Sequence, residues 1–169
     1  MASGRTHDII NLAALPAFVY FLKPESFTGF FTGYLIGTFF LSPDNDIFHS
    51  KPNKRWKFFR FLWKPYTNLF SHRGLSHVPV VGIGLKLVYL LSVFILSVLI
   101  ISGLFFVVSY FTDLDTSVYI PFDFSEDTLK TALFSPFFVS FIVGLILSEI
   151  VHIATDIFFS FFKKLFRFS

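Results

Sequence analysis

Five histidines are the side chains of this sequence with the clearest capacity to bind a metal ion or to move a proton near neutral pH. Carboxylates or a second histidine lie close to them in the sequence, and they stand at the ends of apolar stretches. Imidazole and carboxylate together suit zinc, manganese and iron. Because the sequence holds no cysteine, any metal site must use His, Asp, Glu or backbone ligands. The five are His7, His49, His72, His77 and His152.

One predicted helix carries three potential ligands. Glu149, His152 and Asp156 are spaced i, i+3 and i+7. At about 100° per residue they fall within about 60° of one another on one helix face. The spacing therefore predicts a row of ligands, and the alternative is a hydrogen-bonded polar patch at the membrane surface.

A second segment, residues 71–77, holds two histidines separated by an arginine and a glycine. His72 and His77 are five residues apart, about 140° around a helix, so a single helix face cannot present both. A turn at Gly74 would let them approach one site from two directions. Arg73 between them is placed to bind an anion such as phosphate. The alternative is two unrelated histidines at the membrane surface.

A third segment, residues 43–49, follows a predicted helix that Pro43 ends. Asp44 and Asp46 flank an asparagine and favour a tight turn. Alone, this pattern is typical of an ordinary turn, but beside the other two segments it predicts a ligand loop that includes His49. Either aspartate has the chemistry to bridge two metal ions, as in two-metal hydrolases.

Four apolar stretches must position these residues: 9–22, 27–42, 79–111 and 131–150. A membrane-spanning helix needs about 20 apolar residues. Residues 87–111 hold no charge and meet this length, 131–150 barely meets it, and the first two stretches are marginal. We therefore predict an all-α membrane bundle of about four apolar helices, with the metal ligands clustered at their cytoplasmic ends.

A glycine stripe marks the second stretch. Gly29, Gly33 and Gly37 recur every four residues and so share one helix face. Bare faces of this kind allow two helix backbones to approach closely in lipid. The pattern predicts a buried helix contact, with a chance run of small residues as the alternative.

The composition and charge pattern indicate a membrane protein. Of the 169 residues 54% are hydrophobic and only 15% are charged, which excludes a free-standing cytosolic enzyme, a disordered chain or a basic nucleic-acid module. Between residues 43 and 77 there are seven Lys and Arg but two acids, whereas the 112–130 segment is acidic. We therefore predict one multi-pass domain over residues 1–169 in the inner membrane. The positive-inside rule places its two termini and its basic loop on the cytoplasmic side. Its parts are a cytoplasmic basic loop at 43–78, an external loop at 112–130 and an amphipathic interfacial tail at 157–169.

Two further expectations concern the membrane surface. Trp56, Trp63 and Tyr66 lie among the bases of 51–66 and predict a second interfacial element. Lys86 interrupts the third apolar stretch and is expected to extend its ammonium group to the lipid head groups.

The sequence resembles a family of metal-binding membrane proteins and the broader group of membrane-bound, metal-dependent hydrolases. The resemblance covers most of the chain, and its most specific part is the His72-Arg73-Gly74-Leu75-Ser76-His77 core. The broader group is similar, more remotely, to zinc-dependent phospholipase C, a helical protein with a cluster of metal ions. The resemblance implies metal ligands at His7, Asp44 or Asp46, His72, His77, His152 and Asp156. His49 matches less closely, because the broader family often has His directly after Asp-x-Asp.

From these observations we expect a membrane-embedded hydrolase of a phosphoester, such as a phospholipid or a lipid-linked phosphate, at the cytoplasmic face. Two divalent ions are expected, with zinc as the default and manganese or iron equally suited. Glu149, Asp44 or Asp46 would act as general base and Arg73 would hold the anionic substrate. Membrane lipid is the expected partner, nucleic acid is not expected, and the oligomeric state stays open. The alternative is a non-catalytic metal-binding protein, structural or sensing.

Overall fold

The computed structural model describes residues 3–70, 74–112 and 125–166, and every element in them is a helix. This confirms the all-α prediction. The long helices are α1 (Gly4–Leu22), α2 (Phe27–Phe39), α5 (Val81–Thr112) and α7 (Pro136–Leu165), with the shorter α6 (Glu126–Leu133) before α7. Five short elements lie between α2 and α5: η1 (Pro43–Asp46), α3 (Lys51–Arg55), η2 (Lys57–Leu62), α4 (Trp63–Leu69) and η3 (Leu75–His77).

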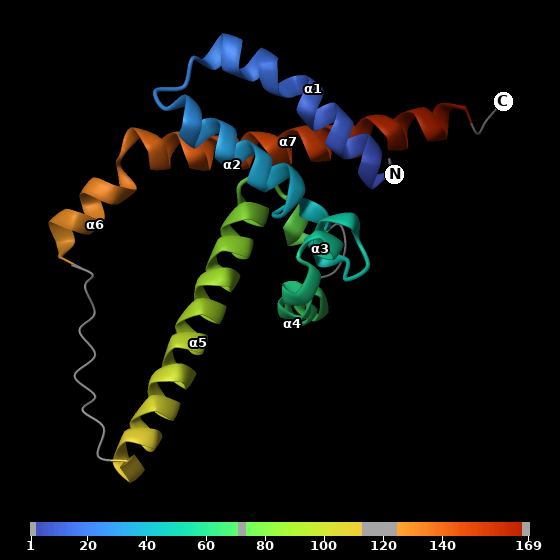
Figure 1. The fold of residues 1–169 in the computed structure, drawn as a ribbon. Coiled ribbons are helices and arrows are strands. Elements are labelled where there is room, and N and C mark those ends of the chain that lie inside the picture. Colours follow the sequence, from blue (N-terminus) through green and yellow to red (C-terminus); the bar gives the residue numbers. More distant parts are fainter. Residues whose placement is uncertain (1–2, 71–73, 113–124, 167–169) are drawn as a thin grey trace.

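Helices α1, α2 and α7 lie alongside one another and form the body of the molecule (Figure 1). Each begins at a serine whose side chain accepts a hydrogen bond from a backbone N–H of the first turn. These serines are Ser3, Ser26 and Ser135, and α7 also has a proline at its first position. The sequence thus fixes where each helix of the body starts.

The glycine stripe of α2 lies against α7, as predicted. A Cβ atom at Gly29 or Gly33 would collide with the backbone carbonyl oxygen of Phe137 or Phe141. From the opposite side, Gly144 of α7 lies against the backbone of α2 in the same way. The two helices therefore touch backbone to backbone, and this close contact fixes α7 relative to the end of α2.

Helix α5 departs from the expected bundle. It runs away from the body formed by α1, α2 and α7, and its buried residues are confined to its first turns: Gly82, Ile83 and Lys86 (Figure 1). By length and composition, α5 and α7 are each able to cross a membrane, and a third of the most apolar window of α7 is buried in the body. The arrangement is thus a three-helix body with a projecting apolar helix, rather than one bundle of about four apolar helices.

The basic loop predicted at 43–78 is folded in its described part. Trp63 and Tyr66 are fully buried against Leu41, Ile83 and Leu145, so this segment has a small core of its own. The interfacial role expected for these two aromatic residues is therefore wrong, because both side chains are inside the protein.

Helices also extend into the two other segments predicted from the sequence, 157–169 and 112–130. Helix α7 continues without a break to Leu165, so most of the tail predicted at 157–169 belongs to the same helix as His152. The segment 112–130 contains the start of α6, and its residues 113–124 lie outside the described residues.

Candidate metal centre

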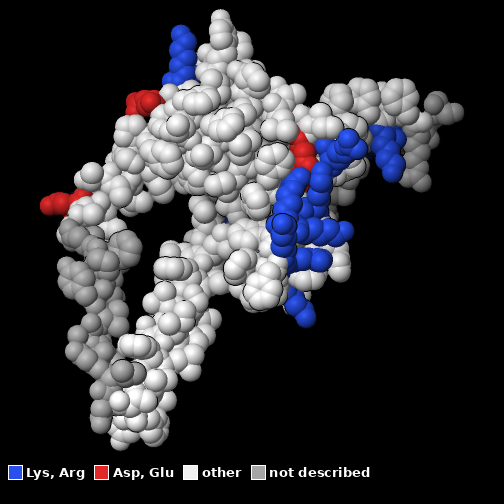
Figure 2. Space-filling view, in the orientation of Figure 1, with Lys and Arg blue, Asp and Glu red and all other residues white. Residues whose placement is uncertain are grey.

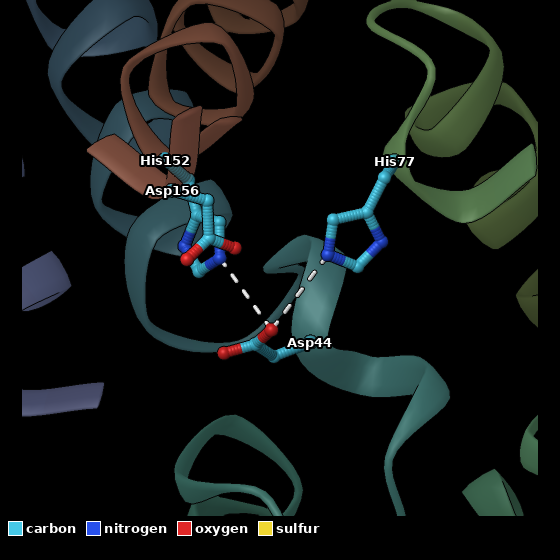
Figure 3. A group of neighbouring side chains, drawn as sticks. All are labelled: Asp44, His77, His152 and Asp156. Carbon is cyan, nitrogen blue, oxygen red and sulfur yellow. Dashed lines mark ion pairs between the residues drawn. The ribbon is translucent and has the colours of Figure 1, made fainter. Parts of the chain in front are cut away.

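Three parts of the chain bring four potential metal ligands together. Asp44 lies in η1 directly after α2, His77 ends η3, and His152 and Asp156 lie one turn apart on α7 (Figure 3). One ligand atom from each side chain lies within 4.8 Å of all the others. Oδ1 of Asp44 is 3.5 Å from Nε2 of His152 and 3.8 Å from Nε2 of His77. The structure thus brings together four of the side chains that the sequence analysis named as potential ligands.

His7 joins this group from the first turns of α1. Its Nε2 atom is 3.3 Å from Oδ1 of Asp156, and its ring stacks on the ring of His152 with 3.8 Å between centroids. His7 is buried. The first and last helices of the body therefore meet at the candidate centre.

Neighbouring side chains orient two of the histidines. Oγ of Ser42 lies 3.3 Å from Nδ1 of His152, and Oδ2 of Asp46 lies 3.3 Å from Nδ1 of His77. Ser76 in turn donates a hydrogen bond of 2.6 Å to the same Asp46 oxygen. A metal-binding histidine commonly has its second nitrogen held by such a partner, which aims the first nitrogen at the metal. Asp46 is thus placed behind His77, rather than within the group of four.

A pair of asparagines fixes the turn that carries Asp44. The side chains of Asn45 and Asn53 hydrogen-bond at 2.7 Å, and Asn53 also donates to the backbone oxygens of Asn45 and Ile47. Both asparagines are fully buried. This contact joins η1 to α3, so the position of Asp44 depends on the fold of the basic segment.

Several buried polar atoms of the group have no hydrogen-bond partner among the described residues. They are Oδ1 of Asp44, Nε2 of His152 and both carboxylate oxygens of Asp156. Buried polar atoms are rarely left without a hydrogen-bond partner, so the atoms named above call for an explanation such as a bound ion. A divalent cation between these atoms would supply the missing partner for all of them. The donor set, imidazole and carboxylate, therefore fits a metal ion.

Burial and charge act in opposite directions on Asp44. Burial favours the neutral acid, but the imidazoles of His152 and His77 outweigh it and lower the pKa of the Asp44 carboxyl far below its ordinary value. Asp44 is therefore a carboxylate at neutral pH, which is the form that binds a cation.

His77 is shifted in the opposite sense. Burial alone would lower its pKa, but the carboxylates of Asp44 and Asp46 raise the pKa of His77 to about 9. In the metal-free protein the imidazole therefore holds a proton at neutral pH, and a metal ion must displace that proton to bind.

A pocket of about 420 Å³ opens beside the group. His77 and Asp156 line it together with Ile153, Ile157 and Ser160. Two isoleucines of α7 thus give the pocket an apolar part, while His77, Asp156 and Ser160 give it a polar part.

Two predicted site residues lie elsewhere. Nδ1 of His49 is 2.9 Å from Nη2 of Arg60, and the structure does not bring His49 into the group. Glu149 is fully buried and accepts a hydrogen bond of 2.9 Å from Lys86. His72 and Arg73, the remaining ligand and the anion-binding residue expected from the sequence, lie outside the described residues.

Lys86 is a residue whose role the sequence reasoning missed. It does not extend to the membrane surface as expected, because its side chain is fully buried in an ion pair with Glu149. The acids close to Lys86 are Glu149, Asp44 and Asp46, which stand at the ends of other apolar stretches. Pairing the single charge of one stretch with the acid of another was the available signal. Ser42, Ser76 and Asn53 carried no comparable signal.

The comparisons with known proteins agree with a metal centre. Residues 2–166 match a family described as uncharacterized metal-binding protein (DUF2227). The chain belongs to this family. It is also 47% identical over 132 residues to an uncharacterized protein of Aquifex aeolicus (strain VF5), which covers 78% of this chain and 90% of that relative. No solved structure matches the chain. The family description extends to metal binding, and not to a hydrolase or to a relative of phospholipase C.

Proposed function

We propose that this metal-binding protein is a membrane-anchored, metal-dependent hydrolase of a phosphoester. One observation carries the proposal: the carboxylate of Asp156, whose two buried oxygens have no hydrogen-bond partner among the described residues, lines an open pocket beside the other potential ligands. A structural metal site is closed by protein ligands, whereas a catalytic site keeps a position for water or substrate. The pocket provides such an approach.

The chain's own residues divide into ligands and supports. His77, His152, Asp44 and Asp156 would hold an ion, and His7 would complete a second site by sharing Asp156. When bound, a divalent ion lowers the pKa of its water to about 7 and stabilises charge on a phosphoryl oxygen. Asp46 and Ser76 keep His77 aimed at the group, and Ile153 and Ile157 of α7 line the pocket beside it. Zinc, manganese and iron all suit this ligand set.

The membrane part of the proposal rests on α5. Its 32 residues are mostly apolar, with Lys86 as the single charged residue, and none of the most apolar window is buried. Lipid would cover this surface, and the basic segment beside it would lie on the cytoplasmic side by the positive-inside rule. A phospholipid or a lipid-linked phosphate is therefore the proposed substrate, and Arg73 remains the proposed anion ligand.

A second function, a metal staple without catalysis, is favoured by a different observation. The five side chains come from α1, η1, η3 and α7, so an ion would cross-link the whole body. In that case the free energy of metal binding would appear mainly as stability of the fold.

Two histidine variants test the metal centre, and measurements of hydrolysis and melting temperature separate the two functions. The full chain is purified in lipid nanodiscs, and His152→Ala is compared with His49→Ala, a histidine outside the group. We expect His152→Ala to lose bound metal and the hydrolysis of a phosphodiester lipid, whereas His49→Ala keeps both. Metal-loaded protein that shows a higher melting temperature but no hydrolysis of any phosphoester lipid would favour the staple. Equal metal content in the two variants would contradict the proposed centre itself.

A further inference from the structure

The basic segment exposes three phenylalanines within four residues. In η2 the exposed fractions are 80% for Phe58, 56% for Phe59 and 56% for Phe61. Trp63 and Tyr66, which follow η2 in the chain, are fully buried in a hydrophobic cluster. The ring of Phe58 contacts those of Phe59 and Phe61 at 5.6 and 5.9 Å between centroids. Three large apolar side chains within four residues thus form one exposed cluster, which is unlike scattered surface hydrophobics.

Exposed cations flank these phenylalanines in the sequence. Lys54, Lys57 and Lys64 are exposed, and none of them makes an ion pair with a described residue. By contrast, Lys51 and Arg55 of the same segment are both paired with Asp8. The sequence contains no Asp or Glu from residue 47 to residue 77. Figure 2 shows Lys and Arg gathered along this flank of the molecule. We call Lys54, Lys57, Phe58, Phe59, Phe61 and Lys64 the docking face.

The docking face lies beside the start of the projecting apolar helix. The hydroxyl of Tyr89, on the third turn of α5, donates a hydrogen bond to the backbone oxygen of Leu62, and its ring contacts Trp63 at 5.9 Å between centroids. Beyond Tyr89, α5 is uncharged to its end at Thr112. The face is therefore fixed at the level where α5 passes from the protein body to its exposed apolar part.

We propose that the docking face binds the surface of an anionic phospholipid membrane, in the same leaflet that α5 enters. Lysines without counter-ions attract acidic head groups, and apolar rings between them enter the boundary between head groups and acyl chains. The charge selects an anionic surface, and the rings select a lipid surface over a purely polar polyanion such as nucleic acid.

The contact has a consequence for the candidate metal centre, and this step rests on the proposed function. Asn53 of α3 clamps the turn that carries Asp44, and α3 leads directly into the docking face. A face docked on lipid would hold Asp44 and the pocket at a constant height above the head groups. The substrate class would then be a lipid phosphate drawn from that same leaflet.

A single fluorescent label tests the docking directly. Because the chain holds no cysteine, Phe59→Cys supplies one unique site for an environment-sensitive dye. The labelled full chain is placed in nanodiscs of phosphatidylcholine alone, or of phosphatidylcholine with phosphatidylglycerol. We expect blue-shifted emission and quenching by head-group spin-labelled lipid in the anionic discs, and weaker effects in the neutral discs.

Two charge variants in the labelled protein provide the matched control. Lys54→Gln with Lys57→Gln removes two charges from the face, and Lys163→Gln with Lys164→Gln removes two exposed charges from the end of α7. The first pair should weaken docking roughly 30-fold, since each charge near an anionic surface contributes strongly, and the second pair should have little effect. Equal effects of the two pairs would overturn the assignment to this face.

A second label separates failure of the docking from failure of the membrane proposal. A dye at Leu96→Cys, on the exposed part of α5, should be quenched by lipid spin-labelled deep in the acyl chains. If this label is quenched but the label at Phe59 stays in water in both kinds of disc, the docking is wrong and the membrane anchor stands. If neither is quenched, both proposals fail. Shielding of Phe59 by an added polyanion, and not by anionic lipid, would also overturn the proposal.

Discussion

Ser76 shows how much of the candidate centre depends on side chains that do not themselves reach the metal group. Its hydroxyl holds Asp46, which in turn lies against His77. Losing such an outer partner commonly weakens metal binding about 10–100-fold. We expect Ser76→Ala to weaken zinc binding by about 10-fold or more, measured by competition with a chromophoric chelator.

The matched control for this prediction is Ser92→Ala. Ser92 is exposed on α5, and its hydroxyl donates to the backbone oxygen of Val88 within the same helix. Its removal should leave zinc affinity unchanged. If Ser76→Ala binds zinc as tightly as Ser92→Ala, the chain from Ser76 through Asp46 to His77 does not support the centre.

The ligand types were predictable from the sequence because histidines beside acids are uncommon at the ends of apolar stretches. The sequence could not show which acid contacts the group and which supports it. Asp44 and Asp46 are two residues apart in one short turn, and the direction of each carboxylate depends on the Asn45–Asn53 contact and on Ser76. Glu149 shares a helix face with His152, yet its partner is a lysine from a different helix.

At the scale of the helices, the contact between α2 and α7 sets the geometry that brings Asp44 to His152. Gly33→Ala would place a Cβ against the carbonyl oxygen of Phe141, so the helices must separate. Forced overpacking of this kind costs about 1–3 kcal/mol. We expect a lower melting temperature by circular dichroism and a weaker affinity for metal.

Gly103→Ala is the control for that substitution. Nothing lies within 4 Å of a Cβ at Gly103, and alanine is favoured over glycine inside a helix by about 0.5–1 kcal/mol. The melting temperature should stay constant or rise. A Gly33→Ala protein as stable as Gly103→Ala would mean that α2 and α7 are not in backbone contact.

The buried pair of Lys86 and Glu149 joins α5 to α7 behind the candidate centre. Glu149→Gln or Lys86→Met alone would leave one buried charge unpaired, at a cost of about 3–5 kcal/mol, whereas the double variant removes both charges and should cost much less than the sum. Unfolding of the two single variants and the double variant, measured as a double-mutant cycle, tests this. Strictly additive losses would contradict the pair.

The exposed pair of Glu126 and Lys130 on α6 is the comparison for this cycle. Its side chains are largely in solvent, so neutralising either one should change stability little. The buried pair also changes the meaning of a Glu149→Gln experiment. Loss of stability is expected from that variant whether or not Glu149 takes part in any reaction.

At the scale of the whole molecule, the helical content followed from the apolar stretches, but the arrangement did not. Stretch lengths cannot distinguish four parallel spans from a three-helix body with a projecting helix. The difference lies in surfaces. Helices α2 and α7 share glycine and serine contacts, and α1 joins them through the hydrogen bond from Tyr34 to the backbone oxygen of Asn11. By contrast, α5 beyond Tyr89 offers large apolar side chains to its surroundings.

Orientation in the membrane is the prediction that belongs to this scale. The Lys and Arg asymmetry places the basic segment inside and the 112–130 segment outside. A membrane-impermeant maleimide added to intact cells should label Thr112→Cys at the far end of α5, and should label His49→Cys only after the membrane is permeabilised. Both side chains are exposed in the protein, so access depends on the membrane. The opposite pattern would place the candidate centre on the other side.

The stacking of His7 on His152 also has a consequence for how the protein is made. The two rings are separated by nearly the whole chain, so the ribosome must add 145 residues after His7 before His152 exists. At ordinary speeds of protein synthesis this takes roughly 7–30 s. During that time the early histidine and the Asp44 turn have no partner on α7. Loading of the ion is therefore expected to be among the last steps of biosynthesis, after the final helix has joined the body.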